Sequence, residues 1–226
     1  MIVVTGATGQ LARLVIESLL RKVPAQSIVA AVRTPERVAD LAARGVQVRR
    51  ADYADPTSLE SAFQGAERVL LISSSEVGQR FVQHRNVIDA AKRAGVSLLA
   101  YTSLLRADTS PLGLAAEHRE TEAYLKASGL PSVILRNNWY TENYLASIPS
   151  ALAHGAFIGS AGEGRIASAA RADYAEAAAT VLTSPGHVGK VYELAGDTAY
   201  TLAELAAELS AQAGKQVTYR DLPEAD

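Results

Sequence analysis

The chain of 226 residues contains no cysteine, which excludes disulfide bonds, a thiolate nucleophile and a cysteine-ligated metal centre. A protein without cysteine is typical of a reducing compartment, so we expect a cytoplasmic location. No apolar run approaches the ~20 residues that a membrane-spanning helix needs. The N-terminus also lacks a basic segment before an apolar stretch, so neither a signal peptide nor a membrane partner is expected.

The chain also has no large excess of positive or negative charge. The chain has 22 Lys and Arg residues against 24 Asp and Glu residues, which gives a net charge of −2, and no basic stripe occurs. Nucleic acid is therefore not an expected partner. The oligomeric state is not indicated by the sequence.

Several catalytic motifs are absent too. There is no G-x-S-x-G, which would mark a nucleophile elbow, and the four histidines lack the spacing of metal ligands, so no metal site is expected. None of the nine tyrosines has a lysine four residues later, the pair with which short-chain dehydrogenases protonate a carbonyl. An ordinary alcohol–ketone oxidoreductase is thus disfavoured. A hydride acceptor that needs no protein acid, such as a quinone or a cationic dye, remains open.

What is present is an alternation of short β-branched runs with longer amphipathic ones. Strands are predicted at residues 1–5, 27–32, 46–51, 68–73, 96–103 and 131–137. Single helices are predicted between them, at residues 10–22, 35–45, 56–65, 79–94 and 115–128. This alternation predicts an α/β fold of the Rossmann type, with a doubly wound parallel sheet whose strand order begins 3-2-1-4.

Residues 1–137 are predicted to form the dinucleotide-binding core. The pattern loosens afterwards, with a helix expected at 171–183, a strand at 190–194 and a helix at 201–213. We interpret residues 138–226 as a smaller substrate-side portion that is intertwined with the core. The final stretch, TYRDLPEAD, resembles the entry to a further helix.

The stretch TGATGQLARLV follows the first predicted strand and opens the first predicted helix. Gly6 and Gly9 allow the tight turn and the close backbone approach that a pyrophosphate requires, and Ala12 stands at the helix-packing position. The helix N-terminus adds free N–H groups and a positive dipole end. The cofactor-binding residues expected here are Gly6, Ala7, Thr8, Gly9, Gln10 and Leu11. An ordinary strand–turn–helix corner is the alternative.

The tip of the second strand indicates the type of dinucleotide. NAD requires a carboxylate there for the adenosine ribose, but the sequence reads AAVRTPER and places Arg33 at the tip. A guanidinium pairs with a 2′-phosphate and stacks on adenine. We therefore expect NADPH as the cofactor, the alternative being a solvated surface arginine.

Polar residues follow the third and fourth strands. Asp52 is placed either to accept a hydrogen bond from the adenine amino group or to cap the helix near Pro56, a task that suits Asp55 better. Ser73, Ser74 and Ser75 follow the fourth strand. Because ligands bind outside the carboxyl ends of parallel strands, this triplet is expected to line the cofactor channel, although a loop of small polar residues is an equal alternative.

Six stretches together resemble the NmrA-like atypical short-chain dehydrogenases, and among them the bacterial NADPH:quinone oxidoreductases, to which the triphenylmethane dye reductases are related. The stretches are VTGATGQLARLVIESLL, VPAQSIVAAVR, LLISSSEVGQRFVQHRNVIDAAKRAGV, AYTSLLRADTSPLGLAAEH, LRNNWYTENYLAS and YELAGDTAYTLAELAAELS. The resemblance covers essentially the whole chain. Members of the family usually continue beyond the length of this chain, with a C-terminal segment that completes the substrate side.

The resemblance implies NADPH-dependent two-electron reduction of quinones, with no metal. It implies further cofactor contacts from the segment after the sixth strand, at Asn138, Trp139, Tyr140, Thr141, Glu142 and Asn143. It makes Asn137, Tyr140, Asn143 and Ser147 the candidates for holding the acceptor. Tyr53 is expected to flank the adenine side, and Arg171 to begin a helix near the same pocket.

Two hypotheses about function follow. In the first, the chain is an NADPH-dependent quinone reductase, an enzyme in which Asn143 and Tyr140 position the acceptor for hydride transfer. In the second, it is a redox-sensing regulator of the NmrA type, which binds the dinucleotide without turning it over. The missing Tyr-x-x-x-Lys pair agrees with both, and the stretch RNNWYTENY favours the enzyme.

Overall fold

The computed structural model describes residues 1–223, which divide into two compact units. The first unit comprises residues 1–137 and 171–194, and the second comprises residues 138–170 and 195 onwards. The chain thus leaves the first unit after Asn137, returns to it at Arg171 and leaves it again after Leu194. The predicted substrate-side portion, residues 138–226, is therefore shared between the two units.

A parallel sheet of seven strands forms the centre of the first unit, and its order is β3-β2-β1-β4-β5-β6-β8. The strands are β1 (Ile2–Thr5), β2 (Ile28–Val32), β3 (Gln47–Arg50), β4 (Arg68–Leu71), β5 (Leu98–Leu104), β6 (Ser132–Asn137) and β8 (Val191–Leu194). Every pairing within this sheet is parallel. The predicted Rossmann-type sheet, including its order 3-2-1-4, is confirmed.

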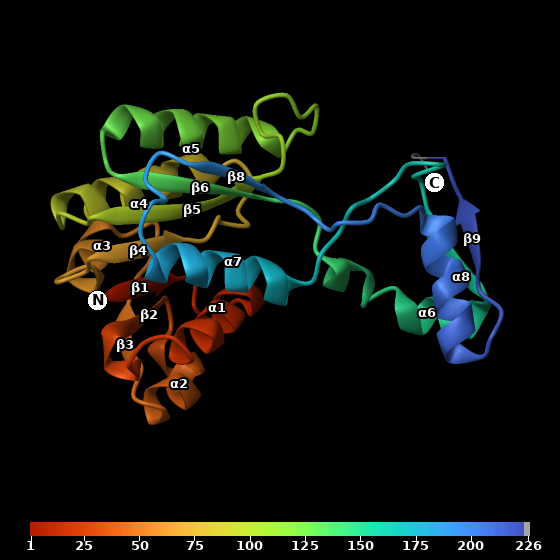
Figure 1. Ribbon diagram of the computed structural model, residues 1–226, viewed down its shortest axis with the longest axis horizontal. Coiled ribbons are helices and arrows are strands. Elements are labelled where there is room, and N and C mark those ends of the chain that lie inside the picture. Colours follow the sequence, from red (N-terminus) through yellow and green to blue (C-terminus); the bar gives the residue numbers. More distant parts are fainter. Residues whose placement is uncertain (224–226) are drawn as a thin grey trace. The chain divides into compact units, whose positions relative to one another are not determined.

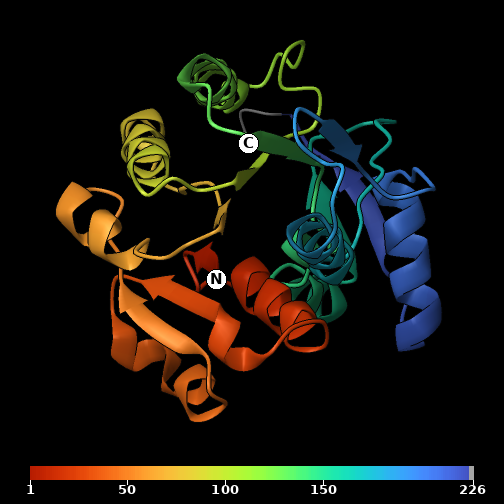
Figure 2. The same ribbon diagram turned by 60° about the vertical axis from the view of Figure 1, so that its left-hand side comes forward.

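Helices cover both faces of this sheet. They are α1 (Gln10–Leu20), α2 (Ala39–Ala43), α3 (Pro56–Ala62), α4 (Arg80–Arg93), α5 (Ala115–Ser128) and α7 (Arg171–Thr183). Helices α1 and α7 pack together over one face, and α3, α4 and α5 follow one another over the other (Figures 1 and 2). Strands β1, β2 and most of β4 and β5 are buried, because a parallel sheet covered on both faces exposes neither.

Local sequence signals account for the element boundaries. Asp55 caps α3, and its side chain accepts a hydrogen bond from the Ser58 N–H. Helix α5 ends at Gly129, which adopts the left-handed conformation that terminates helices. One predicted helix, residues 35–45, is divided into the 3₁₀ turn Pro35–Val38 and α2, because the buried Val38 leaves helical backbone geometry.

The second unit has its own small core. It contains the 3₁₀ turn Thr141–Tyr144, helices α6 (Ile148–His154) and α8 (Leu202–Ala213), and the parallel strand pair β7 (Ala156–Gly159) and β9 (Thr218–Asp221). Phe157, Leu202 and Val217 are buried together there. The expected helix entry at TYRDLPEAD is wrong for residues 218–221, which form β9 through pairing with β7; residues 224–226 lie outside the described part.

Candidate functional site

A cavity of about 240 Å³ opens at the carboxyl ends of β1, β2, β3 and β4. Nine of the residues expected to bind the cofactor line it, namely Gly6, Thr8, Gly9, Arg33, Asp52, Tyr53, Ser73, Ser74 and Ser75. Ala31, Val32, Ala51, Ile72, Glu76 and Gln83 complete the lining. Residues that follow four different strands therefore line one cavity, as the sequence predicts. The cavity lies where a doubly wound sheet binds ligands.

The glycine turn forms the side of the cavity next to α1. Gly6 has a φ of +61°, which is strained for any residue with a Cβ atom. A Cβ atom at Gly9 would lie 3.2 Å from the Gly6 carbonyl oxygen, closer than ordinary van der Waals contact. Gly9 is the N-cap of α1 and has no side chain to satisfy the first N–H groups of the helix. These groups and the helix dipole suit an anionic pyrophosphate, so the turn fits a dinucleotide.

Three other residues of the turn that were expected to bind the cofactor do not line the cavity. Ala7 is fully buried and Leu11 nearly so, so that these side chains belong to the core. The Gln10 Oε1 atom accepts a hydrogen bond of 2.6 Å from the Arg171 Nη1 atom. The first turn of α7, which begins at Arg171 as expected, therefore lies beside the first turn of α1. A contact of Arg171 with the cofactor stays a prediction.

Tyr53 lines the cavity, and its hydroxyl group forms hydrogen bonds with other residues of the protein. The Tyr53 Oη atom donates a hydrogen bond to the Ile72 carbonyl oxygen at 2.8 Å and also shares one with the Thr5 hydroxyl. Burial raises the pKa of the Tyr53 phenol well above its ordinary value. The hydroxyl group of Tyr53 is therefore neutral and already hydrogen-bonded within the protein.

Asp52 and Arg33 lie on the rim of the cavity. The Asp52 Oδ1 atom accepts a hydrogen bond from the Ala54 N–H at 3.0 Å, which stabilises the turn before α3. The Arg33 side chain is 70% exposed and forms an ion pair of 3.3 Å with Glu76. The guanidinium of Arg33 is thus accessible to a phosphate at the tip of β2.

The loop that carries Ser73–Ser75 is fixed along its backbone. The Ser73 N–H donates to the Thr102 Oγ1 atom at 2.9 Å, and the Ser74 N–H donates to the His84 Nε2 atom at 2.8 Å. The Ser74 carbonyl accepts a hydrogen bond of 2.6 Å from the Arg80 Nε atom. These bonds hold the backbone of the loop in place beside the cavity.

Four residues important for this site, Glu76, Arg80, Gln83 and His84, were not among the sequence candidates. Glu76 directly follows the serine triplet, so its position after β4 was a usable signal. His84 is fully buried, and both its ring nitrogens form hydrogen bonds. The partnership of Arg80 with the Ser74 carbonyl depends on tertiary structure and had no sequence signal.

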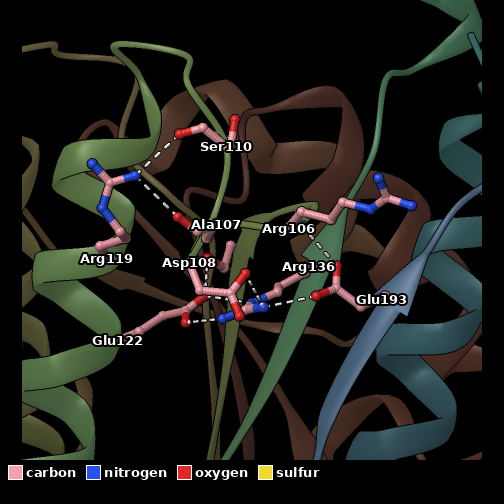
Figure 3. Close-up of polar contacts among 9 residues, drawn as sticks. Arg106, Ala107, Asp108, Ser110, Arg119, Glu122, Arg136 and Glu193 are labelled. Carbon is pink, nitrogen blue, oxygen red and sulfur yellow. Dashed lines mark hydrogen bonds and ion pairs between the residues drawn. The ribbon is translucent and has the colours of Figure 1, made fainter.

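Near the carboxyl end of β6, a cluster of charged groups precedes the point where the chain leaves the first unit. The Arg136 guanidinium is within 2.7 Å of both Glu122 on α5 and Glu193 on β8, and it also pairs with Asp108 (Figure 3). Glu193 additionally accepts a hydrogen bond from the Arg106 N–H. The cluster ties β6 to the neighbouring strand and helix, and thereby fixes the end of the strand where Asn137 lies.

The remaining candidates, from Asn138 to Asn143 and Ser147, lie in the second unit. The segment runs beside residues 167–169: the Thr141 N–H donates to the Ala169 carbonyl, and the Asn138 Nδ2 atom donates to the Ala167 carbonyl at 2.8 Å. Trp139 is about half exposed and its ring packs near Tyr144. Ser147 is the N-cap of α6.

Within residues 1–223, no group of three or more His, Asp or Glu side chains has an arrangement that could hold a metal ion. In the same part of the chain, no helix has the length and apolar character needed to cross a membrane.

Comparisons with known proteins agree with this geometry. The chain is 66% identical to Quinone oxidoreductase 2 of Escherichia coli over its full length, which covers 79% of that protein. The crystal structure of the E. coli NADPH-dependent quinone oxidoreductase complexed with NADPH matches with a TM-score of 0.97, covering 100% of this chain and 80% of that one. Triphenylmethane reductase of Citrobacter sp. matches with a TM-score of 0.95 at 42% identity, covering 98% and 78%.

A family model described as NAD(P)H-binding matches residues 6–185, a segment that begins at the first glycine of the turn and includes all residues that line the cavity. The resemblance inferred from the sequence is thereby confirmed. The chain belongs to the NAD(P)H-binding family.

Proposed function

We propose that this protein is an NADPH-dependent oxidoreductase that reduces quinones by two-electron hydride transfer. The observation that carries the proposal is the cavity, in which a glycine turn at a helix N-terminus and the accessible Arg33 guanidinium line the same space. The similarity to Quinone oxidoreductase 2 of E. coli, and to the crystal structure of the E. coli enzyme complexed with NADPH, supports it. The absence of cysteine supports a cytoplasmic location as part of the proposal.

Each part of the cavity would bind one part of the dinucleotide. The N–H groups at the start of α1 would bind the pyrophosphate, with Gly6 and Gly9 permitting its close approach. Arg33 would pair with the 2′-phosphate, and Asp52 and Tyr53 would flank the adenine. The serine loop, whose backbone is fixed, would close the opposite side of the cavity.

The acceptor would be held by Asn137, Tyr140, Asn143 and Ser147, and the segment Asn138–Asn143 would bind the nicotinamide end of the cofactor. The bound cofactor supplies the hydride, and the residues of the chain orient the two rings and exclude water. No protein acid is required for this chemistry, because a reduced quinone anion takes its proton from solvent. This agrees with the absence of a Tyr-x-x-x-Lys pair.

The experiment is to mix the purified protein with NADPH and a simple benzoquinone and to follow the loss of NADPH by its absorbance. Protein-dependent loss of NADPH that saturates with the quinone concentration is expected. Demonstrable NADPH binding without turnover would reject the enzyme in favour of a regulator of the NmrA type. Substitution of Ser147, the acceptor candidate outside the segment Asn138–Asn143, by Ala should lower kcat/KM for the quinone while leaving the NADPH dissociation constant nearly unchanged.

A further inference from the structure

The Glu76 carboxylate lies on the cavity wall next to the guanidinium that would recognise the 2′-phosphate. Its Oε1 atom is 3.3 Å from the Arg33 Nη1 atom, and its Oε2 atom accepts a hydrogen bond of 2.7 Å from the Gln83 Nε2 atom. All three side chains line the cavity. A negative charge is therefore placed at the same position as the proposed phosphate-binding cation.

The position of Glu76 is defined by its surroundings. The Glu76 N–H donates a hydrogen bond of 3.1 Å to the Ser74 Oγ atom, which fixes the backbone at this point of the loop. Gln83, which holds the second carboxylate oxygen, is itself buried in the first turn of α4. The hydrogen bond from Gln83 holds one carboxylate oxygen of the half-exposed Glu76 beside the cavity.

NADPH and NADH would interact differently with the Glu76 carboxylate. A phosphate monoester carries a charge of about −1.5 to −2 at neutral pH, so that it competes with Glu76 for Arg33 and is repelled by it. The 2′-hydroxyl group of NADH is uncharged and can donate a hydrogen bond to a carboxylate. Glu76 thus opposes the phosphorylated cofactor and tolerates or favours the unphosphorylated one.

We propose that Glu76 is a specificity-determining residue that limits the preference for NADPH over NADH. The inference rests on the proposed function, since it requires that the cavity binds the adenosine part of the dinucleotide. Cofactor preference is then a balance between two neighbouring charges: Arg33 attracts the 2′-phosphate, and Glu76 weakens that attraction.

The test is the substitution Glu76→Gln, which keeps the shape of the side chain and the possible hydrogen bond to Gln83 but removes the charge. Dissociation constants for NADPH and NADH are measured by calorimetry at low and at high ionic strength. The ratio Kd(NADH)/Kd(NADPH) is expected to rise about threefold or more at low ionic strength, as expected for an exposed charge interaction. The rise should become smaller as salt screens the charges.

Glu60→Gln is the matched control. Glu60 forms an ion pair with Arg93 in which both side chains are about half exposed, compared with 70% for Arg33 and 49% for Glu76, and neither residue lines the cavity. This substitution changes the net charge by the same amount and is expected to leave the ratio unchanged.

An unchanged or lower ratio in Glu76→Gln, or an equal rise in Glu60→Gln, would overturn the inference. Binding of neither dinucleotide to the unsubstituted protein would overturn the proposed function together with it. Binding and turnover of NADPH by the unsubstituted protein, with a ratio that Glu76→Gln does not raise, would overturn this inference alone. Thermal unfolding of each variant confirms that the comparison is made on folded protein.

Discussion

The His84 Nε2 atom accepts a hydrogen bond from the Ser74 N–H at a distance of 2.8 Å. The tautomer follows from the other ring nitrogen. The Thr121 hydroxyl donates to the Glu117 carbonyl, so it must accept the proton of His84 Nδ1. A neutral, buried imidazole thus connects the core to the loop that lines the cofactor cavity.

We expect His84→Leu to raise the KM for NADPH by about tenfold, which corresponds to about 1.4 kcal/mol, with a smaller effect on kcat. The reason is that the Ser74 N–H would lose its acceptor, and the loop would leave its position to find another. His84→Gln retains an acceptor oxygen and should restore much of the affinity. Steady-state kinetics of both variants provide the measurement, and an equal KM in the two would argue against the positioning role.

The stability of the protein should decrease in acid because of its buried histidines. Burial, the neighbouring His118 and the Arg80 cation lower the pKa of His84 to about 3, and burial followed by Arg80 lowers that of His118 to about 4. Below the ordinary histidine pKa near 6.5, the unfolded chain takes up protons that the folded chain does not. Each histidine therefore removes up to about 1.4 kcal/mol of unfolding free energy per pH unit between pH 6.5 and its folded pKa.

Urea denaturation at pH 7 and at pH 5 checks this expectation. The unfolding free energy should be lower at pH 5, and His118→Phe should reduce the difference between the two pH values. A stability that is the same at both pH values would contradict the assignment of neutral buried rings.

Gly6→Ala should destabilise the protein by about 1 kcal/mol, because alanine is strained in the left-handed region, and it should also weaken NADPH binding. The added methyl group would lie on the side of Tyr53, with the Tyr53 Oη atom 3.8 Å away. Gly95→Ala is the control: its φ is +67° and a Cβ atom there meets open space. The melting temperature should fall by a similar amount in both variants. Calorimetry should detect weaker NADPH binding only for Gly6→Ala.

Arg33→Asp should weaken NADPH binding far more than NADH binding, because the substitution replaces the phosphate-binding cation by a second carboxylate beside Glu76. Titration of both dinucleotides gives the comparison. A similar loss of affinity for each would mean that Arg33 does not contact the 2′-phosphate.

Arg136→Met should lower the unfolding free energy by about 3 kcal/mol or more, since it leaves the nearly buried Glu122 carboxylate without its cation. The hydrogen bonds of Arg136 to Glu122 raise its pKa well above the ordinary value, although burial by itself lowers it. The exposed pair of Arg93 and Glu60 is the comparison, and Arg93→Met is expected to cost less than about 1 kcal/mol. Chemical denaturation of both variants would show the difference.

The parts of the fold that could be predicted from sequence are those with local signals. Helix α5 has the predicted bounds because an amphipathic pattern ends at Gly129, and α3 begins where Asp55 caps it. Strands β7 and β9 were missed, because they pair only with each other, across about 60 residues of sequence. Tertiary pairing alone makes such segments strands.

The same distinction holds for the site. Gly6, Arg33 and Ser74 were found because they follow strands whose carboxyl ends meet at one edge of a parallel sheet. Arg80 and His84 were not found as site residues, because a helix residue that fixes a loop backbone has the same sequence pattern as an ordinary core residue. The roles of Asn143 and Tyr140 remain predictions.

The route of the chain between its two units has a consequence for the order of synthesis. Strand β8 and helix α7 belong to the first unit, but they are made only after residues 138–170. On the ribosome, the sheet can therefore assemble from β1 to β6 before its last strand, β8, has been synthesised. Until α7 is made, the face of α1 that packs on it stays exposed to solvent. The nascent first unit thus cannot be completed before half of the second unit has emerged.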